Sequence, residues 1–195
     1  MTPCQKRLAE AISKQIAISL ANLKLRETLQ YQSFRDALTG LFNRRYLEAS
    51  IVREVHRVSR ENQPLGIIMI DVDNFKKFND TFGHEAGDLV LQTIGTFLKD
   101  NIRQSDIACR FGGEELTIIL ANASLENTKE RAEQIRQGVK NLHLKYGDQS
   151  LGTITISLGV AVFPNHGETP EDLFHAADIA LYQAKSQGRD RVVSA

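Results

Sequence analysis

The sequence has little cysteine, no net charge and no long apolar run, and each of these features excludes a class of protein. Its two cysteines, Cys4 and Cys109, stand far apart, so neither belongs to a CxxC pair that binds metal. Isolated thiols are typical of a reducing compartment, and we expect a cytoplasmic protein, although a longer parent protein could be membrane-anchored. No apolar run approaches the ~20 residues of a membrane span, and the N-terminus lacks the pattern of a secretory signal.

The charges balance, because lysine plus arginine number 24 and aspartate plus glutamate also number 24. This balance gives no electrostatic reason to expect a nucleic acid or a membrane surface as partner. A P-loop is excluded because GxxxxGK[ST] does not occur. With 195 residues, of which 42% are hydrophobic and 25% charged, the composition is that of a globular chain with one domain of ordinary size. Any anionic ligand must therefore be bound by a local group of charges.

The N-terminal segment, residues 1–35, predicts a long amphipathic signalling helix. No glycine occurs between Pro3 and Phe34. Apolar residues recur there at helical steps of three and four, at Leu8, Ile12, Ile16, Leu20 and Leu23. A lone helix cannot bury this stripe, which must pack on its own domain, on an upstream domain or on a second copy of itself. We favour self-pairing because the stripe precedes the body of the chain.

The body of the chain, residues 36–195, alternates between predicted strands and helices. We expect helices at 43–61, 75–82, 85–98, 125–141 and 171–187, and strands at 65–70, 107–111, 116–120, 153–163 and 191–193. This order is the split β-α-β arrangement of an α+β, ferredoxin-like, palm-type domain whose central sheet contains antiparallel strands. Because such a fold hosts many functions, the function must be argued from the sites.

Acidic residues follow two predicted strands. The buried run LGIIMI ends at Asp71, and Glu114 and Glu115 follow a Gly-Gly pair that predicts a two-residue turn with both glycines at positive φ. Strand alternation would place Glu114 and Glu115 on opposite faces. Each acid alone is best interpreted as a solvated loop residue, but Asp71 with Glu114 on neighbouring strands supplies the oxygen ligands that Mg²⁺ prefers.

Two other segments offer sites for phosphate. A helix begins near Phe75 and Lys76, so free backbone N–H groups and one ammonium group are available there. Lys185 and Arg189, at the end of the last helix, either bind phosphate or only offset the helix dipole. The glycine pair at 112–113 is either a plain turn or a place where a nucleotide approaches the backbone, and the two interpretations are compatible.

Five stretches of the sequence resemble the GGDEF family of diguanylate cyclases. They are DALTGLFNRR (36–45), IDVDNFKKFNDTFGHEAGD (70–88), RFGGEEL (110–116), TISLGVAVFP (155–164) and ALYQAKSQGRDRV (180–192). The likeness covers residues 36–195 in the expected order. Any one motif would be weak evidence, but five in register argue against a chance match.

The resemblance implies a role for each acid of the two strand ends. Asp71 matches the first metal-binding aspartate of the family, and the backbone carbonyl of Val72 is a further metal ligand. Glu114 stands where the family name has aspartate and remains a metal ligand, while Glu115 is either metal-linked or structural. We therefore expect Asp71, Glu114 and Glu115 to form the catalytic centre with Mg²⁺ or Mn²⁺. Leu116 replaces the phenylalanine of the family name, a change expected to affect packing only.

The resemblance also implies the substrate contacts. Asn79 and Asp88 match the guanine contacts, and a carboxylate can accept from guanine N1–H and the 2-amino group together, which adenine cannot offer. Without the resemblance, Asn79 is only a polar residue near a helix end and Asp88 a charge near a helix start. The phosphate contacts fall on Lys76, Lys185 and Arg189, with the backbone at Phe75, Gly112 and Gly113.

A second site is implied by Arg103 and Asp106, which form an RxxD pattern upstream of the glycine pair. In the family this pattern binds the product, cyclic di-GMP, and inhibits the enzyme. Arginine can bind phosphate or stack on guanine, and aspartate can accept from the guanine edge. The alternative is a surface ion pair near a strand start. Gln134, with Arg131 and Arg136 close by, stands where some relatives complete the site with a basic residue.

The resemblance implies an enzyme that condenses two GTP molecules into cyclic di-GMP and two pyrophosphates across a homodimer, under an upstream sensor domain. One alternative is a catalytically silent module that binds GTP or cyclic di-GMP. Another is a polymerase-like palm acting on nucleic acid, against which the neutral composition argues. The presence of Asp71, Glu114, Glu115 and both glycines favours the enzyme. We expect neither a nucleic-acid partner nor membrane contact by this chain.

Overall fold

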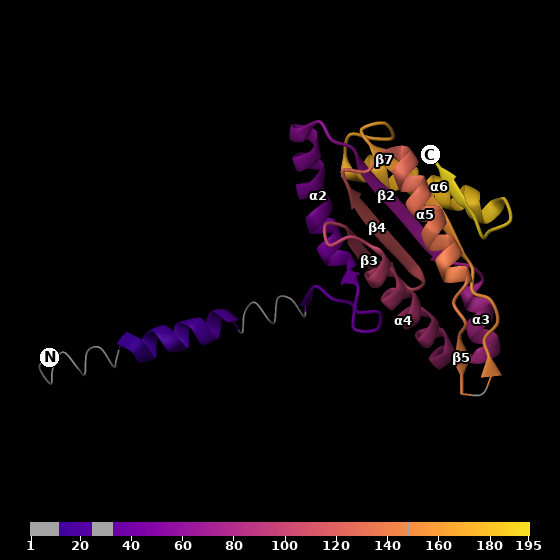
Figure 1. Cartoon of the computed structure of the whole chain (residues 1–195), viewed down its shortest axis with the longest axis horizontal. Helices are drawn as coiled ribbons and strands as arrows, with labels where there is room; N and C mark the ends of the chain where they lie inside the picture. Colours follow the sequence, from indigo (N-terminus) through magenta and orange to yellow (C-terminus); the bar gives the residue numbers. More distant parts are fainter. Residues whose placement is uncertain (1–11, 25–32, 148) are drawn as a thin grey trace, which may run out of the picture. The chain divides into compact units, whose positions relative to one another are not determined.

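The computed structural model describes residues 12–24, 33–147 and 149–195 (Figure 1). The chain divides into two units, Met1–Arg35 and Asp36–Ala195. In the first unit residues 12–24 form a helix, as predicted, and its apolar side chains are more than half exposed, at Ile12, Ile16, Leu20 and Leu23. The rest of the predicted N-terminal helix, Leu8 included, lies outside the described residues. Within the described residues no helix is both long and apolar enough to cross a membrane.

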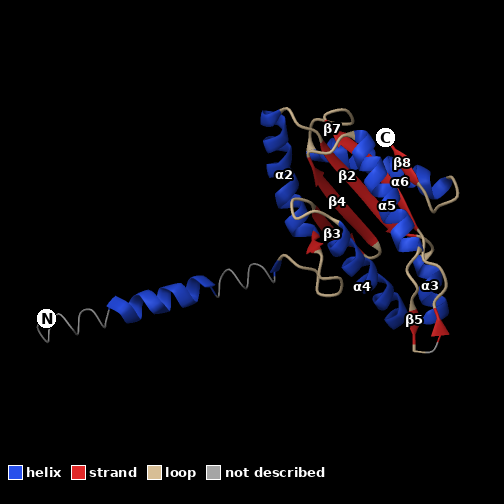
Figure 2. Ribbon diagram, viewed as in Figure 1, coloured by secondary structure: helices blue, strands red, loops and turns tan. Residues whose placement is uncertain are grey.

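The second unit is built on a six-stranded mixed sheet (Figure 2). Its strands, in spatial order, are β1 (Phe42–Asn43), β3 (Ile107–Gly112), β4 (Glu115–Ala121), β2 (Leu65–Val72), β7 (Ile156–Phe163) and β8 (Val192–Ser194). The inner pairs β3–β4, β4–β2 and β2–β7 are antiparallel, whereas the edge pairs β1–β3 and β7–β8 are parallel. The four inner strands follow the chain order of the split β-α-β arrangement, which confirms the predicted fold class.

Helices cover both faces of this sheet (Figure 2). Helices α2 (Arg44–Glu61) and α6 (Pro170–Ser186) pack on one face. Helices α4 (His84–Asn101) and α5 (Leu125–Lys140) pack on the other, and α3 (Phe75–Phe82) packs against α4. As predicted, α2 begins after Asn43, whose side chain accepts a hydrogen bond of 3.1 Å from the Tyr46 N–H.

Strand β2 is buried along its whole length because it has a partner strand on each side and helices on both faces. Ile67 and Met69 contribute to the core under α2 and α6. Ile68 and Ile70 contribute to the core under α4 and α5. This double burial explains why the sequence shows a continuous apolar run at β2 in place of alternation.

The structure corrects the predicted Gly-Gly turn. Strand β3 includes Gly112 and β4 begins at Glu115, so the turn is centred on Gly113 and Glu114. Of the two glycines only Gly113 has a positive φ, of 44°. The prediction was wrong because the register shifts between Arg110 and Gly112, which moves the turn by one residue.

Other boundaries also differ from the prediction. Strand β2 continues through Asp71 and Val72, so Asp71 lies within the strand and not beyond its end. Strand β7 begins at Ile156, three residues later than expected. A small hairpin of β5 (Lys145–Tyr146) and β6 (Gln149–Ser150) was not predicted, because strands of two residues are too short to show alternation.

Candidate active site

Three predicted acids lie beside the turn, where β2 ends and β4 begins. Asp71 is paired in register with Glu115 on β4, and directly paired residues of antiparallel strands share a face of the sheet. The carbonyl of Glu114 accepts a hydrogen bond of 3.4 Å from the Val72 N–H, which places the turn against the end of β2. The fold therefore brings the three carboxylates into one neighbourhood, with Glu114 supplied by the turn and not by a strand.

Asp71 is a buried carboxylate in a site rich in negative charge. It is only 7% exposed, and its oxygen lies 2.7 Å from Lys185 Nζ. Burial raises the pKa of Asp71, the hydrogen bond and charge of Lys185 oppose that rise, and Glu114 and Glu115 add to it. Lys185 is paired with Asp71 alone, and the charges of Glu114 and Glu115 still act on Asp71, so a divalent cation bound beside these carboxylates would offset their repulsion.

The number of protein ligands that this site offers to a metal ion is small. The part of the chain that the structure describes contains no group of three or more His, Cys, Asp or Glu side chains arranged to hold a metal ion. Asp71, Glu114 and the backbone carbonyl of Val72 would be a smaller set. Mg²⁺ commonly binds through one or two carboxylates and leaves its other positions to water and substrate phosphates.

A cavity of about 640 Å³ lies beside the acids, between α3, α4 and the turn. It is lined by Phe75, Lys76, Asn79, Asp80, His84, Asp88, Leu91, Arg110, Gly113 and Glu114. It therefore unites the predicted guanine contacts with the predicted phosphate contacts of α3 and with Glu114. Asp71, Gly112, Lys185 and Arg189 do not line it.

Asn79 packs against α4 at Gly87, where no side chain stands in its way. A Cβ atom at Gly87 would lie 1.9 Å from Asn79 Oδ1 and 3.1 Å from Phe75 Cζ. The Oδ1 atom of Asn79 is buried and has no hydrogen-bond partner among the described residues. Because an unsatisfied buried amide oxygen is costly, a turn of the Asn79 amide toward a ligand that donates an N–H would be favoured.

Arg110 is a site residue for which no role was predicted from the sequence. Its Nε donates a 2.9 Å hydrogen bond to the Gly113 carbonyl, and its Nη1 lies 3.3 Å from both carboxylate oxygens of Asp36. Asp36 also accepts hydrogen bonds of 2.8 Å from the N–H and the hydroxyl of Thr39. Arg110 thus ties the turn to the loop that precedes β1. Its position two residues before the glycine pair was the only signal in the sequence.

The basic residues of the C-terminal segment lie apart from the cavity lining. Lys185, a predicted phosphate contact, is paired with Asp71 in this structure. Arg189, the other one, is exposed and follows α6 in the loop formed by residues 188–190, so it is not part of the helix end as expected. Lys185 therefore approaches the acids from α6.

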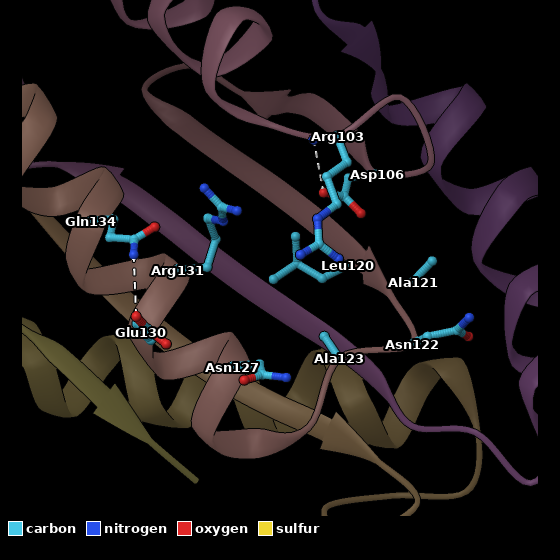
Figure 3. A pocket seen from close by; sticks show the side chains of 10 residues that line it. All are labelled: Arg103, Asp106, Leu120, Ala121, Asn122, Ala123, Asn127, Glu130, Arg131 and Gln134. Carbon is cyan, nitrogen blue, oxygen red and sulfur yellow. Dashed lines mark hydrogen bonds between the residues drawn. The ribbon is translucent and has the colours of Figure 1, made fainter.

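The RxxD residues line a separate cavity of about 260 Å³ (Figure 3). Its lining consists of Arg103, Asp106, Leu120, Ala121, Asn122, Ala123, Asn127, Glu130, Arg131 and Gln134. Figure 3 shows Arg103 and Arg131 on opposite sides of it, from the loop before β3 and from α5. Asp106 accepts a hydrogen bond of 3.0 Å from the Arg103 N–H. Gln134 lies where it was predicted, whereas Arg136 does not line this cavity and instead contacts Asp190.

Comparison with known proteins gives one family. The sequence model of the family described as "Diguanylate cyclase, GGDEF domain" matches residues 33–191. The response regulator PleD of Caulobacter vibrioides is 42% identical over 160 residues, which are 81% of this chain and 35% of PleD. The diguanylate cyclase DosC of Escherichia coli is 39% identical over 175 residues, which are 90% of this chain and 38% of DosC. The chain thus spans little more than a third of the length of these relatives.

Two solved structures extend this likeness to the fold. One is the coiled coil and GGDEF domain of DgcB from Caulobacter crescentus in complex with c-di-GMP, which has a TM-score of 0.85 and 27% identity over the whole of both chains. The other is the diguanylate cyclase SiaD from Pseudomonas aeruginosa in complex with its activator SiaC. It has a TM-score of 0.82 and 36% identity, and the match covers 98% of this chain and 73% of SiaD.

Proposed function

Because the chain belongs to the GGDEF family of diguanylate cyclases, we propose that it is an active member, which condenses two GTP molecules into cyclic di-GMP and two pyrophosphates. The observation that carries this proposal is that the charges of Glu114 and Glu115 act on the buried Asp71, and that Glu114 also lines the cavity that Lys76 lines. A catalytically silent module would need no such group of carboxylates, whose mutual repulsion is costly without a cation.

In this proposal the cavity binds the nucleoside. Asn79 and Asp88 face the guanine base, because a buried amide and a carboxylate can pair with the donors and acceptors of its edge. Lys76 and the backbone at Phe75, at the start of α3, receive phosphate oxygens. Gly112 and Gly113 leave the backbone open to the nucleotide, because a Cβ atom at either would find no heavy atom within 4 Å.

The carboxylates would hold Mg²⁺ or Mn²⁺ with the carbonyl of Val72. Bound there, the cation supplies a Lewis acid for the α-phosphate and for the attacking 3′-hydroxyl. Asp71 and Glu114 would hold it, and Glu115 adds negative charge on the same face of the sheet as Asp71. Lys185, which is paired with Asp71 in this structure, would leave Asp71 and bind the phosphates of GTP. Arg189 would bind the same phosphates.

Two copies of the chain are needed in this proposal, because one cavity holds one GTP and the 3′-hydroxyl of each must reach the α-phosphate of the other. We propose a homodimer paired through the N-terminal helix, which raises the effective concentration of one half-site for the other. In a longer protein, an upstream sensor domain would act on this pairing.

We also propose that cyclic di-GMP inhibits the enzyme at the cavity of Arg103 and Asp106. This is supported by two arginines, Arg103 and Arg131, which can contact phosphate or stack on guanine on opposite sides of one cavity. The structure of DgcB, to which this chain is similar, was determined with c-di-GMP.

The test is to incubate the chain with GTP and Mg²⁺ and to measure pyrophosphate and a cyclic dinucleotide. Glu114→Ala is expected to lower turnover by at least ~10²-fold, as loss of a group that stabilises developing charge does, with an unchanged circular dichroism spectrum. The matched control is Glu54→Ala, which removes a carboxylate from α2 and is expected to keep full turnover. A chain that binds GTP and releases no pyrophosphate would be the silent module instead.

A further inference from the structure

Asp190 connects α5 to the segment that directly follows β2. Its carboxylate is ion-paired with Arg136, and Lys140 Nζ lies 2.5 Å from it. Its backbone N–H donates a 3.1 Å hydrogen bond to Asp73, two residues after Asp71. Asp73 is fixed in turn by the hydroxyls of Thr155 and Ser157, at 2.8 and 2.6 Å. Asp190 is therefore held from two sides.

The loop of residues 188–190 adopts a backbone that needs such support. Gly188, Arg189 and Asp190 have consecutive positive φ values of 112°, 60° and 48°. A non-glycine residue in the left-handed region is strained, and it persists where surrounding contacts determine the conformation. The side chain of Arg189 is exposed, so the support comes from backbone contacts, such as the 3.0 Å hydrogen bond from the Arg189 N–H to the Ala184 carbonyl, and from the contacts of Asp190.

Arg136 is the better placed of the two cations of α5 that contact Asp190. It is only 8% exposed, and its Nη1 also donates to the Asp190 backbone carbonyl at 3.2 Å. Glu133 fixes the rest of the guanidinium through bonds of 2.8 and 2.6 Å. Lys140 is 41% exposed and contacts the carboxylate alone, so solvent screens its contribution. Arg136 thus fixes both the backbone and the side chain of Asp190.

We propose that Arg136 is a positioning residue for GTP binding, which acts through Asp190 to hold the loop that presents Arg189 to the triphosphate. The proposal rests on the proposed function, because it takes GTP as the ligand and Arg189 as a phosphate contact. Arg189 meets the triphosphate in both the ground state and the transition state. Loosening its loop therefore weakens binding in both states, which raises KM and leaves kcat nearly unchanged.

The experiment compares the full chain with Arg136→Ala, Arg189→Ala and the double variant by steady-state kinetics with GTP and Mg²⁺. Each single variant is expected to raise KM about tenfold, which corresponds to about 1.4 kcal/mol, with kcat within twofold of the unchanged chain. The double variant is expected to match Arg189→Ala, because both changes remove one contact. An unchanged KM in Arg136→Ala, or effects that multiply in the double variant, would overturn the proposal.

Two further variants separate positioning from stability. Arg136→Lys retains a cation that can reach Asp190 and is expected to restore part of the lost affinity. Arg57→Ala, which removes an arginine of α2 bound to Glu54 and Glu61, is the matched control and is expected to leave KM unchanged.

Asp190→Asn decides the matter if Arg136→Ala does not fold. Asparagine tolerates the left-handed backbone but lacks the charge that pairs with Arg136. A raised KM supports the proposal, and an unchanged KM overturns it. Failure of the proposed function would look different, because the unchanged chain would then form no product.

Discussion

Gly87 lies on α4 at a point where a Cβ atom would come within 1.9 Å of Asn79 Oδ1. We therefore predict that Gly87→Ala displaces Asn79 and raises KM for GTP about tenfold, the loss of one good hydrogen bond. The variant should not unfold the chain, because alanine favours a helix over glycine by about 1 kcal/mol. The measurement is KM for GTP together with thermal unfolding.

The control for this prediction is the same change in an Asn79→Ala background. There the clash with Asn79 is removed and only the 3.1 Å approach to Phe75 Cζ is left, so Gly87→Ala should add little to KM. A Gly87→Ala variant with the KM of the unchanged chain would contradict the assigned position of Asn79.

A second prediction at the scale of single residues concerns Asp36 and the way the stability of the fold depends on pH. Burial raises its pKa, but the hydrogen bonds from Thr39 and the charge and hydrogen bond of Arg110 outweigh burial, so the pKa lies below 3.8. A carboxyl group with a lowered folded-state pKa stabilises the fold above its unfolded pKa, and this contribution is lost as the pH falls through the folded value.

We therefore predict that Asp36→Asn lowers the free energy of unfolding by about 1 kcal/mol at pH 7. The difference from the unchanged chain should stay constant down to about pH 4 and shrink below it. Urea unfolding over a pH series measures this difference. Asp178→Asn, at an exposed position of α6, is the control and should show no difference at any pH. A difference that grows on acidification would show that folding raises the pKa of Asp36 and does not lower it.

At the scale of elements, the sequence predicted what depends on neighbours along the chain. The continuous apolar run predicted β2, and the capping residue Asn43 predicted the start of α2. The pairing of strands is set by contacts between distant segments, so the shift between Arg110 and Gly112 and the resulting turn at Gly113 could not be predicted.

Contacts between distant segments also limited what could be predicted of the candidate active site. The resemblance supplied Asn79, Asp88 and Lys76, and the fold placed them around one cavity. Neither the resemblance nor the spacing could show that Lys185 pairs with Asp71, because that contact joins α6 to β2. Arg110 was missed for the same reason, since its partner Asp36 lies 74 positions away in the sequence.

Gly159 provides a prediction about two elements in contact. A Cβ atom at this position of β7 would lie 2.1 Å from the Ala177 carbonyl oxygen and 2.3 Å from the Leu181 nitrogen, both in the backbone of α6. Because backbone atoms cannot turn aside, Gly159→Ala must push α6 away from the sheet. We predict a loss of about 3 kcal/mol in the free energy of unfolding, at the upper end for overpacking.

The measurement is urea unfolding, and Gly112→Ala is the matched control. At Gly112 a Cβ atom finds no heavy atom within 4 Å and φ is not positive, so its stability should change little. Equal stability of Gly159→Ala and the unchanged chain would mean that β7 and α6 are farther apart than described.

At the scale of the whole molecule, the second unit has its own two cores, one on each face of the sheet. The first unit leaves apolar side chains exposed, with Ile16 at 54%, Leu20 at 63% and Leu23 at 58%. An exposed stripe of this kind is expected to be covered by another surface, and a second copy of the helix offers an equal stripe.

We therefore predict that deletion of residues 1–34 leaves a folded second unit whose specific activity falls steeply at low protein concentration. At high concentration the truncated and full chains should converge, because mass action then brings two half-sites together without the helix. Leu20→Glu, a charge within the stripe, should reproduce the deletion, whereas Ala21→Glu, on the opposite side of the helix, should not. Equal specific activity of the full and truncated chains at every concentration would show that the helix has no part in the reaction. It would not bear on the roles proposed for the acids of β2 and the turn.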